Sequence, residues 1–303
     1  GTASNVTYEY GLNFTPDLVW AKARDRAGEW HMLSDSTRGT NSQLFSNATN
    51  AQDTKSTVIQ SFDTGGFTVG SDSLVNNNGT DYVAWCLKAN GGTTSSNTDG
   101  SATSTVQVNT AAGFSIAKMT FAGAGSIGHG LGVVPDLVFL KGLSAAEDWQ
   151  VYHTANGTGK YLKLNTSDAV ATRADSFSTV NSTIVTNSWT GASVDWIMYS
   201  FKSIDSFSKF GSYTGNGSTS NIIETGFEPA FLMTKRTDTA GYNWYIWDNK
   251  RNTTNPRYLN LQADRANAES DYSAYPHDFL SNGFEVKTSN AAFNASGGTY
   301  IYM

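Results

Sequence analysis

Histidine, cysteine and carboxylate side chains are the residues of this chain whose chemistry could serve catalysis or metal binding. The four histidines, His31, His129, His153 and His277, have no neighbour at the spacing of a metal site and none beside a candidate nucleophile. No GxSxG or HExxH motif occurs, and the glycines around His129 precede a predicted strand, whereas a phosphate-binding loop precedes a helix. The sequence therefore predicts no catalytic residue, no cofactor and no bound metal, and we do not expect an enzyme.

The acidic side chains and the single cysteine leave this expectation unchanged. Glu147 and Asp148 are adjacent, so in an extended segment they point to opposite faces and do not form an acid and base pair. Residues 97–100 (NTDG) are too short for a calcium loop and are typical of a turn, although a calcium site built from separate loops stays open. Cys86 has no partner for a disulfide and lies in a run typical of a buried strand.

Aromatic residues offer a second kind of chemistry, which is ligand binding by stacking. Tyr242, Tyr245 and Trp247 occur together in the run YNWYIWD, and in a strand Tyr245 and Trp247 share one face. A flat aromatic surface stacks on sugar rings or packs on a neighbouring module or subunit, and packing is the commoner role. These three residues are the candidate binding surface in the sequence.

Composition predicts that short strands position these side chains. Only 15% of the 303 residues are charged, well below the usual quarter, while 13% are aromatic and Gly, Ser, Thr and Asn are abundant. This pattern is typical of many strands joined by polar turns, with at most one helical turn near residues 261–269. The net charge of −6 comes without a basic cluster, and no apolar stretch reaches the length of a transmembrane helix, so we expect neither nucleic-acid binding nor membrane insertion.

One hairpin pattern recurs along the chain. Residues 226–252 predict a first strand that ends at Lys235, a turn TDTAG and a second strand over residues 243–248. Similar patterns occupy residues 12–35 and 132–153. The chain is therefore predicted to be a tandem repeat, in which changes of length fall in turns.

The repeat spacing suggests which residues are equivalent. The first and second copies share a spacing of 119 residues for Pro, Lys and Trp, which aligns them without a gap, whereas the third copy has one extra residue in the turn. This alignment places Trp30, Trp149 and Trp244 at one position. We expect that position to form the core of each module, together with the residue two places later, namely Met32, Val151 and Ile246.

These observations predict an all-β chain of three tandem, pseudo-repeated antiparallel β-sandwich modules. Residues 1–90 form the first module, in which the start of the unit is missing, and residues 91–104 form a linker or exposed loop. Residues 105–205 and 206–303 form the second and third modules. Because the first copy starts mid-unit and the last strand ends at Met303, we expect the native chain to continue at both ends.

Several motifs in combination resemble a known family. TGFEPAFLMTKRTD, YNWYIWDNKRNTTNP, DFLSNGFEV and NASGGTYIYM, with GFSIAKM and GHGLGVVPDLVFLK upstream, are similar to a repeated β-domain of tailed-bacteriophage tail fibre and virion structural proteins, especially from marine phages. The resemblance covers nearly the whole chain. It weakens in the second copy, where VYHTANGTGKYLKLN lacks the DNKRN segment. It implies a virion protein and carries over no catalytic residue.

The resemblance and the composition together give a functional hypothesis. We expect a structural protein of a tail fibre or surface appendage, exposed on the virion, that binds host-surface glycans or other virion subunits without turnover. Symmetric appendages imply a homo-oligomer, and repeated weak contacts add through multivalency. The alternative is a lectin-like carbohydrate-binding module of a secreted or cell-surface bacterial protein. A polysaccharide depolymerase is the least favoured class, since it needs carboxylates gathered in a cleft.

Overall fold

The computed structural model describes residues 4–6, 11–121, 124–188 and 195–303. Within them the chain is almost entirely β-structure, and the named strands pair antiparallel, as the composition predicts. The single helix of the described residues is α1 (Ser73–Asn76), capped by Asp72. The sequence allows at most one helical turn near residues 261–269, and none forms there, because Leu261 belongs to a strand and is buried.

The first sheet pair lies within residues 4–87. A five-stranded sheet has the order β5-β4-β3-β2-β8, and a three-stranded sheet has the order β1-β7-β6. Val19 and Met32 of the large sheet pack against Ile59 and Phe67 of the small one. The strands are β1 (Ser4–Val6), β2 (Leu18–Ala23), β3 (Met32–Asp35), β4 (Ser42–Phe45), β5 (Asp53–Thr54), β6 (Ile59–Asp63), β7 (Gly66–Val69) and β8 (Tyr82–Leu87).

The second sheet pair extends the same plan. Its large sheet has the order β16-β15-β14-β13-β19-β11-β10-β9, and its small sheet has the order β12-β18-β17. The strands are β9 (Ser95–Asn97), β10 (Ser104–Asn109), β11 (Phe114–Thr120), β12 (Gly125–Gly128), β13 (Leu137–Gly142), β14 (Gln150–His153), β15 (Lys160–Lys163), β16 (Ala171–Thr172), β17 (Thr179–Val180), β18 (Ile184–Asn187) and β19 (Asp195–Phe201). Strand β9 lies inside the segment predicted as a linker or loop, where it pairs with β10 as an edge strand.

The third sheet pair follows directly. Its large sheet has the order β20-β28-β22-β23-β24-β25, and its small sheet has the order β21-β27-β26. The predicted hairpin of residues 226–252 is present as β22 and β23. The strands are β20 (Gly211–Thr214), β21 (Asn221–Glu224), β22 (Phe231–Arg236), β23 (Tyr245–Asp248), β24 (Leu259–Gln262), β25 (Ser270–Asp271), β26 (His277–Leu280), β27 (Gly283–Val286) and β28 (Thr299–Tyr302).

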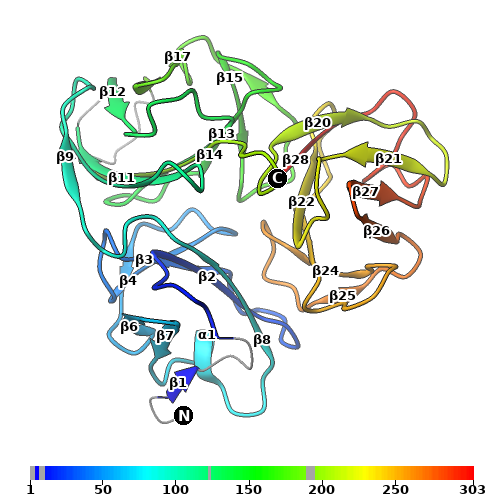
Figure 1. Cartoon of the computed structure of the whole chain (residues 1–303), viewed down its shortest axis with the longest axis horizontal. Coiled ribbons are helices and arrows are strands. Elements are labelled where there is room, and N and C mark those ends of the chain that lie inside the picture. The colour runs from blue at the N-terminus through cyan, green and yellow to red at the C-terminus, as the bar shows by residue number, and fades with distance from the viewer. Residues whose placement is uncertain (1–3, 7–10, 122–123, 189–194) are drawn as a thin grey trace.

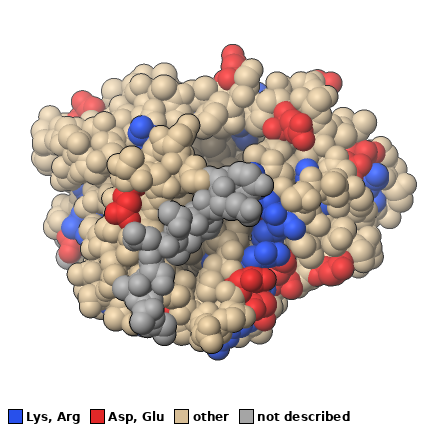
Figure 2. All heavy atoms as spheres, turned by 60° about the horizontal axis from the view of Figure 1, so that its bottom comes forward, with Lys and Arg blue, Asp and Glu red and all other residues tan. Residues whose placement is uncertain are grey.

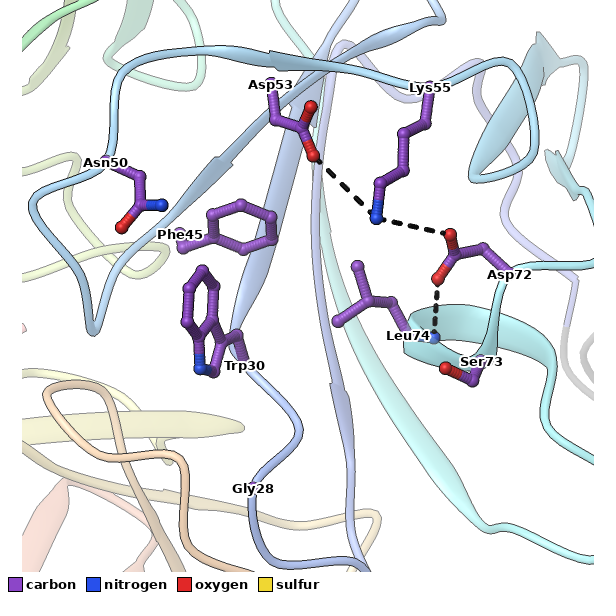
Figure 3. A pocket seen from close by; sticks show the side chains of 9 residues that line it. All are labelled: Gly28, Trp30, Phe45, Asn50, Asp53, Lys55, Asp72, Ser73 and Leu74. Atoms are coloured by element: carbon purple, nitrogen blue, oxygen red, sulfur yellow. Dashed lines mark hydrogen bonds and ion pairs between the residues drawn. The ribbon is translucent and has the colours of Figure 1, made fainter. Parts of the chain in front are cut away.

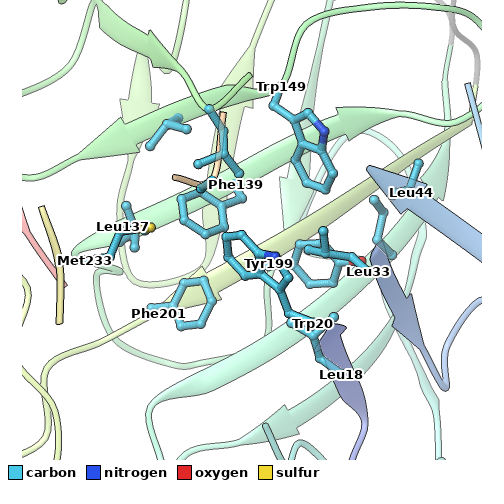
Figure 4. Close-up of a cluster of buried hydrophobic side chains, with 14 of the residues drawn as sticks. Leu18, Trp20, Leu33, Leu44, Leu137, Phe139, Trp149, Tyr199, Phe201 and Met233 are labelled. Atoms are coloured by element: carbon cyan, nitrogen blue, oxygen red, sulfur yellow. The ribbon is translucent and has the colours of Figure 1, made fainter. Parts of the chain in front are cut away.

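The three sheet pairs lie around a common centre (Figure 1), with the large sheets inside and the small sheets outside. One face of each large sheet packs on its own small sheet, and the other face contributes to a shared hydrophobic cluster. Leu33, Val151 and Ile246 reach this cluster from the three sheet pairs in turn. Figure 4 shows side chains from all three meeting there, among them Leu33, Trp149 and Met233. Neither face of a large sheet is therefore left to solvent as a whole.

The junctions between the sheet pairs use corresponding hydrogen bonds. At each junction, the loop before the second hairpin strand donates a main-chain N–H to a carbonyl of the preceding sheet pair, where the third pair counts as preceding the first, and a second main-chain bond runs back. The first set is Glu147 N to Thr49 O at 2.8 Å, Gly241 N to Ser167 O at 2.8 Å and Gly28 N to Ala266 O at 2.7 Å. The second set is Gln52 N to Leu143 O, Val170 N to Thr237 O and Glu269 N to Arg24 O. The contacts therefore close a ring.

Strand register corrects the predicted alignment of the hairpins. Leu18 pairs with Asp35, Leu137 with His153 and Phe231 with Asp248. Counting back four residues from each second partner gives His31, Trp149 and Trp244 as the equivalent set. Trp30 is not in it, since the connection of the second hairpin is one residue shorter than those of the first and third.

The same register corrects the expected role of the tryptophans. Trp149 and Trp244 do not lie in the core of a single sandwich. They lie in the central cluster, and each indole N–H donates across a junction, from Trp149 to Phe45 O at 2.8 Å and from Trp244 to Lys163 O at 2.9 Å. Met32, in contrast, faces the core of the first sandwich. The equal spacing of 119 residues between the first two copies did not reveal that the turn of the second hairpin is one residue shorter than that of the first.

Candidate functional site

The aromatic surface proposed from the sequence is not available to a ligand. Trp247 is fully buried, and Tyr245 is 8% exposed. Both lie in the core of the third sandwich, where Trp247 packs on His277 at 4.1 Å and Tyr245 packs on Phe293 at 4.7 Å between ring centroids. The prediction of a stacking surface at these two residues is wrong, because the small sheet covers the face that they share.

Tyr242 takes part in the same packing. Its ring is partly buried against the third sandwich core, and the guanidinium carbon of Arg236 lies 4.8 Å from the ring centroid. Its carbonyl oxygen accepts a 2.6 Å hydrogen bond from Lys235 Nζ. Tyr242 therefore has a structural role at the edge of the third sandwich. It does not form an open binding surface with Tyr245 and Trp247.

An open hollow of about 290 Å³ lies instead on the first sheet pair. Trp30 and Phe45 form one wall, and Leu74 of α1 faces them (Figure 3). Polar side chains complete the lining, and they come from the segment after β4 and from the start of α1. They are Asn50, Asp53, Lys55, Asp72 and Ser73, with Gly28 at the margin.

The order of residues in the first hairpin, Trp30 followed by His31, places Trp30 in this wall. His31 takes the buried position that Trp149 and Trp244 occupy elsewhere, and it accepts a 3.0 Å hydrogen bond from Trp20 Nε1 through its Nδ1. Trp30, one residue earlier, is only partly buried and packs edge-on against Phe45, with ring centroids 4.7 Å apart. The sequence carries one sign that Trp30 differs from Trp149 and Trp244. The first copy has Trp-His at these two positions, whereas the other copies have Asp-Trp and Asn-Trp.

A short chain of charges forms the polar side of the hollow. Lys55 Nζ lies 3.8 Å from Asp53 Oδ2 and 3.5 Å from Asp72 Oδ2. Asp72 is fixed, because its Oδ1 accepts the Leu74 N–H at 3.0 Å and caps α1. Asp53 accepts a 3.0 Å bond from Gln43 Nε2. Lys55 and Asp53 remain 44% and 41% exposed, so their ion pair contributes about 0–1 kcal/mol and can yield to a ligand.

The arrangement suits a ligand with one apolar face and several hydroxyl groups. An aromatic wall can pack on the C–H face of a sugar ring, while carboxylate, amide, ammonium and hydroxyl groups opposite can exchange hydrogen bonds with its hydroxyls. Lys55 bridges the two acidic residues of the hollow. The hollow therefore favours recognition of a polar, uncharged ring compound.

Burial shifts the pKa values of several interior groups that do not line the hollow. Burial lowers the pKa of His153 to about 4 and that of His277 to about 3, and it lowers the pKa of His31 well below its ordinary value. Burial likewise raises the pKa of Cys86 to about 12. Within the described residues, no three His, Cys, Asp or Glu side chains are grouped so that they could hold a metal ion.

Three corresponding lysines mark the junctions. Burial lowers the pKa values of Lys22, Lys141 and Lys235 to about 8. Their ammonium groups donate to main-chain oxygens of hairpin loops, namely Arg26 O, Glu147 O and Tyr242 O. Lys141 Nζ also donates across a junction to Thr49 O at 3.0 Å. These lysines are structural, because each is fully or almost fully buried.

Acidic and basic side chains are intermixed on the face shown in Figure 2, and no broad area of that face carries only Lys and Arg. None of the described helices is both long and apolar enough to cross a membrane. A family model described as "Domain of unknown function (DUF7483)" matches residues 1–303. No curated protein and no solved structure matches the chain.

Proposed function

This chain belongs to the DUF7483 family, and we propose that it is a structural protein of a bacteriophage tail fibre or surface appendage that acts by binding, without turnover. Two independent features support this proposal. The motifs of the three hairpins resemble repeated β-domains of phage virion proteins, and the first sheet pair carries a hollow suited to a sugar ring.

The hollow at Trp30 is the observation that carries the binding role. Its aromatic wall is held from behind, since Phe45 O accepts the indole N–H of Trp149 across the junction. Its acidic wall is held by the cap of α1 and by Gln43. A binding site whose walls are fixed before the ligand arrives loses less conformational entropy on binding, which favours affinity from a small contact area.

The closed ring of sheet pairs suits an exposed appendage. Each large sheet buries both faces, and the central cluster joins residues far apart in the sequence. Such a body can present its hollow in a fixed orientation. If several chains assemble in one appendage, weak sugar contacts add through multivalency.

Glycan binding is tested with an array of bacterial surface oligosaccharides. The intact chain is expected to bind a subset of them, and Trp30→Ala is expected to lose that binding at least about tenfold, which corresponds to about 1.4 kcal/mol. Phe207→Ala is the matched control, because Phe207 is an aromatic residue that is 61% exposed and does not line the hollow. Equal glycan binding by Trp30→Ala and the intact chain would show that the hollow is not the binding site.

The virion assignment needs a separate experiment. Gold-labelled antibody against the chain is expected to decorate tail fibres or the surface of intact phage particles in electron micrographs. Label on bacterial cells or in the medium, with none on particles, would overturn the assignment. It would favour a lectin-like module of a secreted or cell-surface bacterial protein, which the same hollow would serve.

A further inference from the structure

The aromatic wall of the hollow has counterparts in the other two sheet pairs. The residue before each of His31, Trp149 and Trp244 contacts the last residue of the strand that follows, which is β4, β15 or β24. The three contacts are an aromatic pair of Trp30 with Phe45, an ion pair of Asp148 with Lys163 at 2.8 Å, and a hydrogen bond from Asn243 to Gln262 at 3.0 Å. The fold therefore does not require aromatic rings at this position, which points to a use for them in the first sheet pair.

The two carboxylates of the hollow are held in place by amide donors. Asp72 Oδ1 accepts the Leu74 N–H at 3.0 Å, which caps α1. Asp53 Oδ2 accepts the side-chain amide of Gln43 at 3.0 Å, and its Oδ1 accepts the main-chain N–H of Thr54 at 2.8 Å. Neither carboxylate can therefore turn away from the hollow without losing hydrogen bonds.

Lys55 is held less firmly than the two carboxylates between which it lies (Figure 3). Its Nζ is 3.8 Å from Asp53 Oδ2 and 3.5 Å from Asp72 Oδ2, and its side chain is 44% exposed. Both distances exceed the length of a charge-assisted hydrogen bond, which is about 2.7–2.9 Å. An exposed ammonium group on a flexible stem can turn to solvent. The fixed charges of the hollow are therefore negative, and its mobile charge is positive.

A ligand carboxylate in the hollow would meet this fixed negative charge. Asp53, Lys55 and Asp72 are the charged residues among those that line it, and together they carry a net charge of −1. If Lys55 turned toward a ligand carboxylate, two fixed carboxylates would remain beside the ligand, and like charges so close repel each other. The hydroxyls of an uncharged sugar can instead donate to both carboxylates while Lys55 stays between them.

We propose that the hollow admits uncharged sugar rings and excludes acidic ones, and that Asp53 and Asp72 are the residues that exclude acidic sugars. This inference rests on the proposed sugar-binding function of the hollow and narrows its ligands to one class. The sugar ring packs on Trp30 and Phe45, and its hydroxyls donate to the two carboxylates. Hexoses and N-acetylhexosamines belong to this class, whereas uronic acids and sialic acids do not.

Pairs of methyl pyranosides that differ only at carbon 6 test the proposal. Each pair consists of a neutral hexoside and the corresponding uronic acid, in the gluco, galacto and manno series. Binding to the intact chain at pH 7 is followed by NMR titration of the Trp30 indole N–H. In at least one series the neutral member is expected to bind at least about tenfold more tightly than the acid at low salt. The ratio of affinities is expected to shrink at about 0.5 M salt, because salt screens exposed charges.

Two variants of the hollow change its charge in opposite directions. Asp53→Asn makes the lining neutral, so the ratio of the two affinities is expected to fall about threefold. Lys55→Met makes the net charge of the lining −2, so the ratio is expected to rise about threefold. Asp205→Asn is the matched control, because Asp205 is exposed and does not line the hollow. It changes the charge of the whole chain as Asp53→Asn does, and the ratio is expected to stay unchanged.

The outcomes separate the selectivity from the sugar-binding function. Equal or tighter binding of the acids, lost in Trp30→Ala, would overturn the selectivity and leave sugar binding in place. A ratio that changes in the same direction in Asp53→Asn and Lys55→Met, or in neither, would show that charge in the hollow does not cause the selectivity. Absence of binding by every neutral pyranoside would overturn the inference, and the proposed function fails with it if the glycan array also shows no binding that depends on Trp30.

Discussion

Trp149 donates its indole N–H to the main-chain oxygen of Phe45 at 2.8 Å, and this bond links the second sheet pair to the wall of the hollow on the first. The ring of Phe45 in turn packs against Trp30. The junction and the candidate site thus share one residue. Changes at the junction are expected to affect the hollow, although Trp149 does not line it.

Trp149→Phe is expected to destabilise the protein. The variant leaves the buried carbonyl of Phe45 without its indole donor and creates a small cavity, which together cost about 1–3 kcal/mol. Urea unfolding measures the change in the free energy of unfolding. Trp30→Phe is the control, since Trp30 is only partly buried, and its cost is expected to stay within about 1 kcal/mol. A neutral Trp149→Phe would show that the junction bond contributes little.

The stability of the protein is expected to fall as the pH drops below about 6.5. The folded pKa values of His153 and His277, about 4 and about 3, lie below their ordinary value of 6.5, so the unfolded chain binds more protons in this range. Each histidine then costs about 3 kcal/mol or more by pH 4. Asp264 opposes this trend, because its pKa is raised to about 6 and its protonation favours the folded state.

The acid effect is checked by urea unfolding at several pH values. His277→Gln is expected to reduce the loss of stability between pH 6.5 and pH 4, even if it lowers stability at neutral pH. Asp264→Asn is expected to steepen the loss of stability, because it removes a carboxyl group whose protonation favours the folded state. Identical slopes in the three proteins would contradict this account.

The stability of the protein is expected to rise between about pH 8 and pH 9. The pKa values of Lys22, Lys141 and Lys235 fall to about 8 in the folded state from an ordinary 10.5, so the unfolded chain binds more protons in this range. Lys141→Met is expected to lower the slope of stability against pH, since it removes one of three corresponding groups. Cys86 opposes the rise as the pH approaches 9, because its pKa is raised to about 12 in the folded state. An exposed lysine, Lys160, provides the control as Lys160→Met.

Asp53→Asn is expected to weaken glycan binding without unfolding the chain. The change keeps the size of the side chain but removes the charge that faces Lys55 and weakens a hydrogen-bond acceptor of the hollow. Because Asp53 is 41% exposed, the free energy of unfolding is expected to change by less than about 1 kcal/mol. Isothermal titration with a glycan from the array measures the affinity, and unchanged affinity would exclude Asp53 from the contact.

The sequence alone determined the class of fold and the positions of most hairpins. Low charge and abundant turn residues predicted an all-β chain, and the strands after Pro16, Pro135 and Pro229 form where the pattern placed them. These signals are local, since turn chemistry and alternation act over a few residues. The tandem-repeat interpretation and its boundaries remain predictions, and so does the virion origin.

Only the tertiary structure decided which aromatic residues are exposed. Alternation gives each strand two faces, but it does not say what covers them, and here the small sheet covers Trp247 while the central cluster covers Trp149. Equal spacing also concealed the shift that puts His31 in the interior and Trp30 in the hollow. Strand register and packing between distant segments fix these positions, because a one-residue change in a turn reverses the face that a side chain takes.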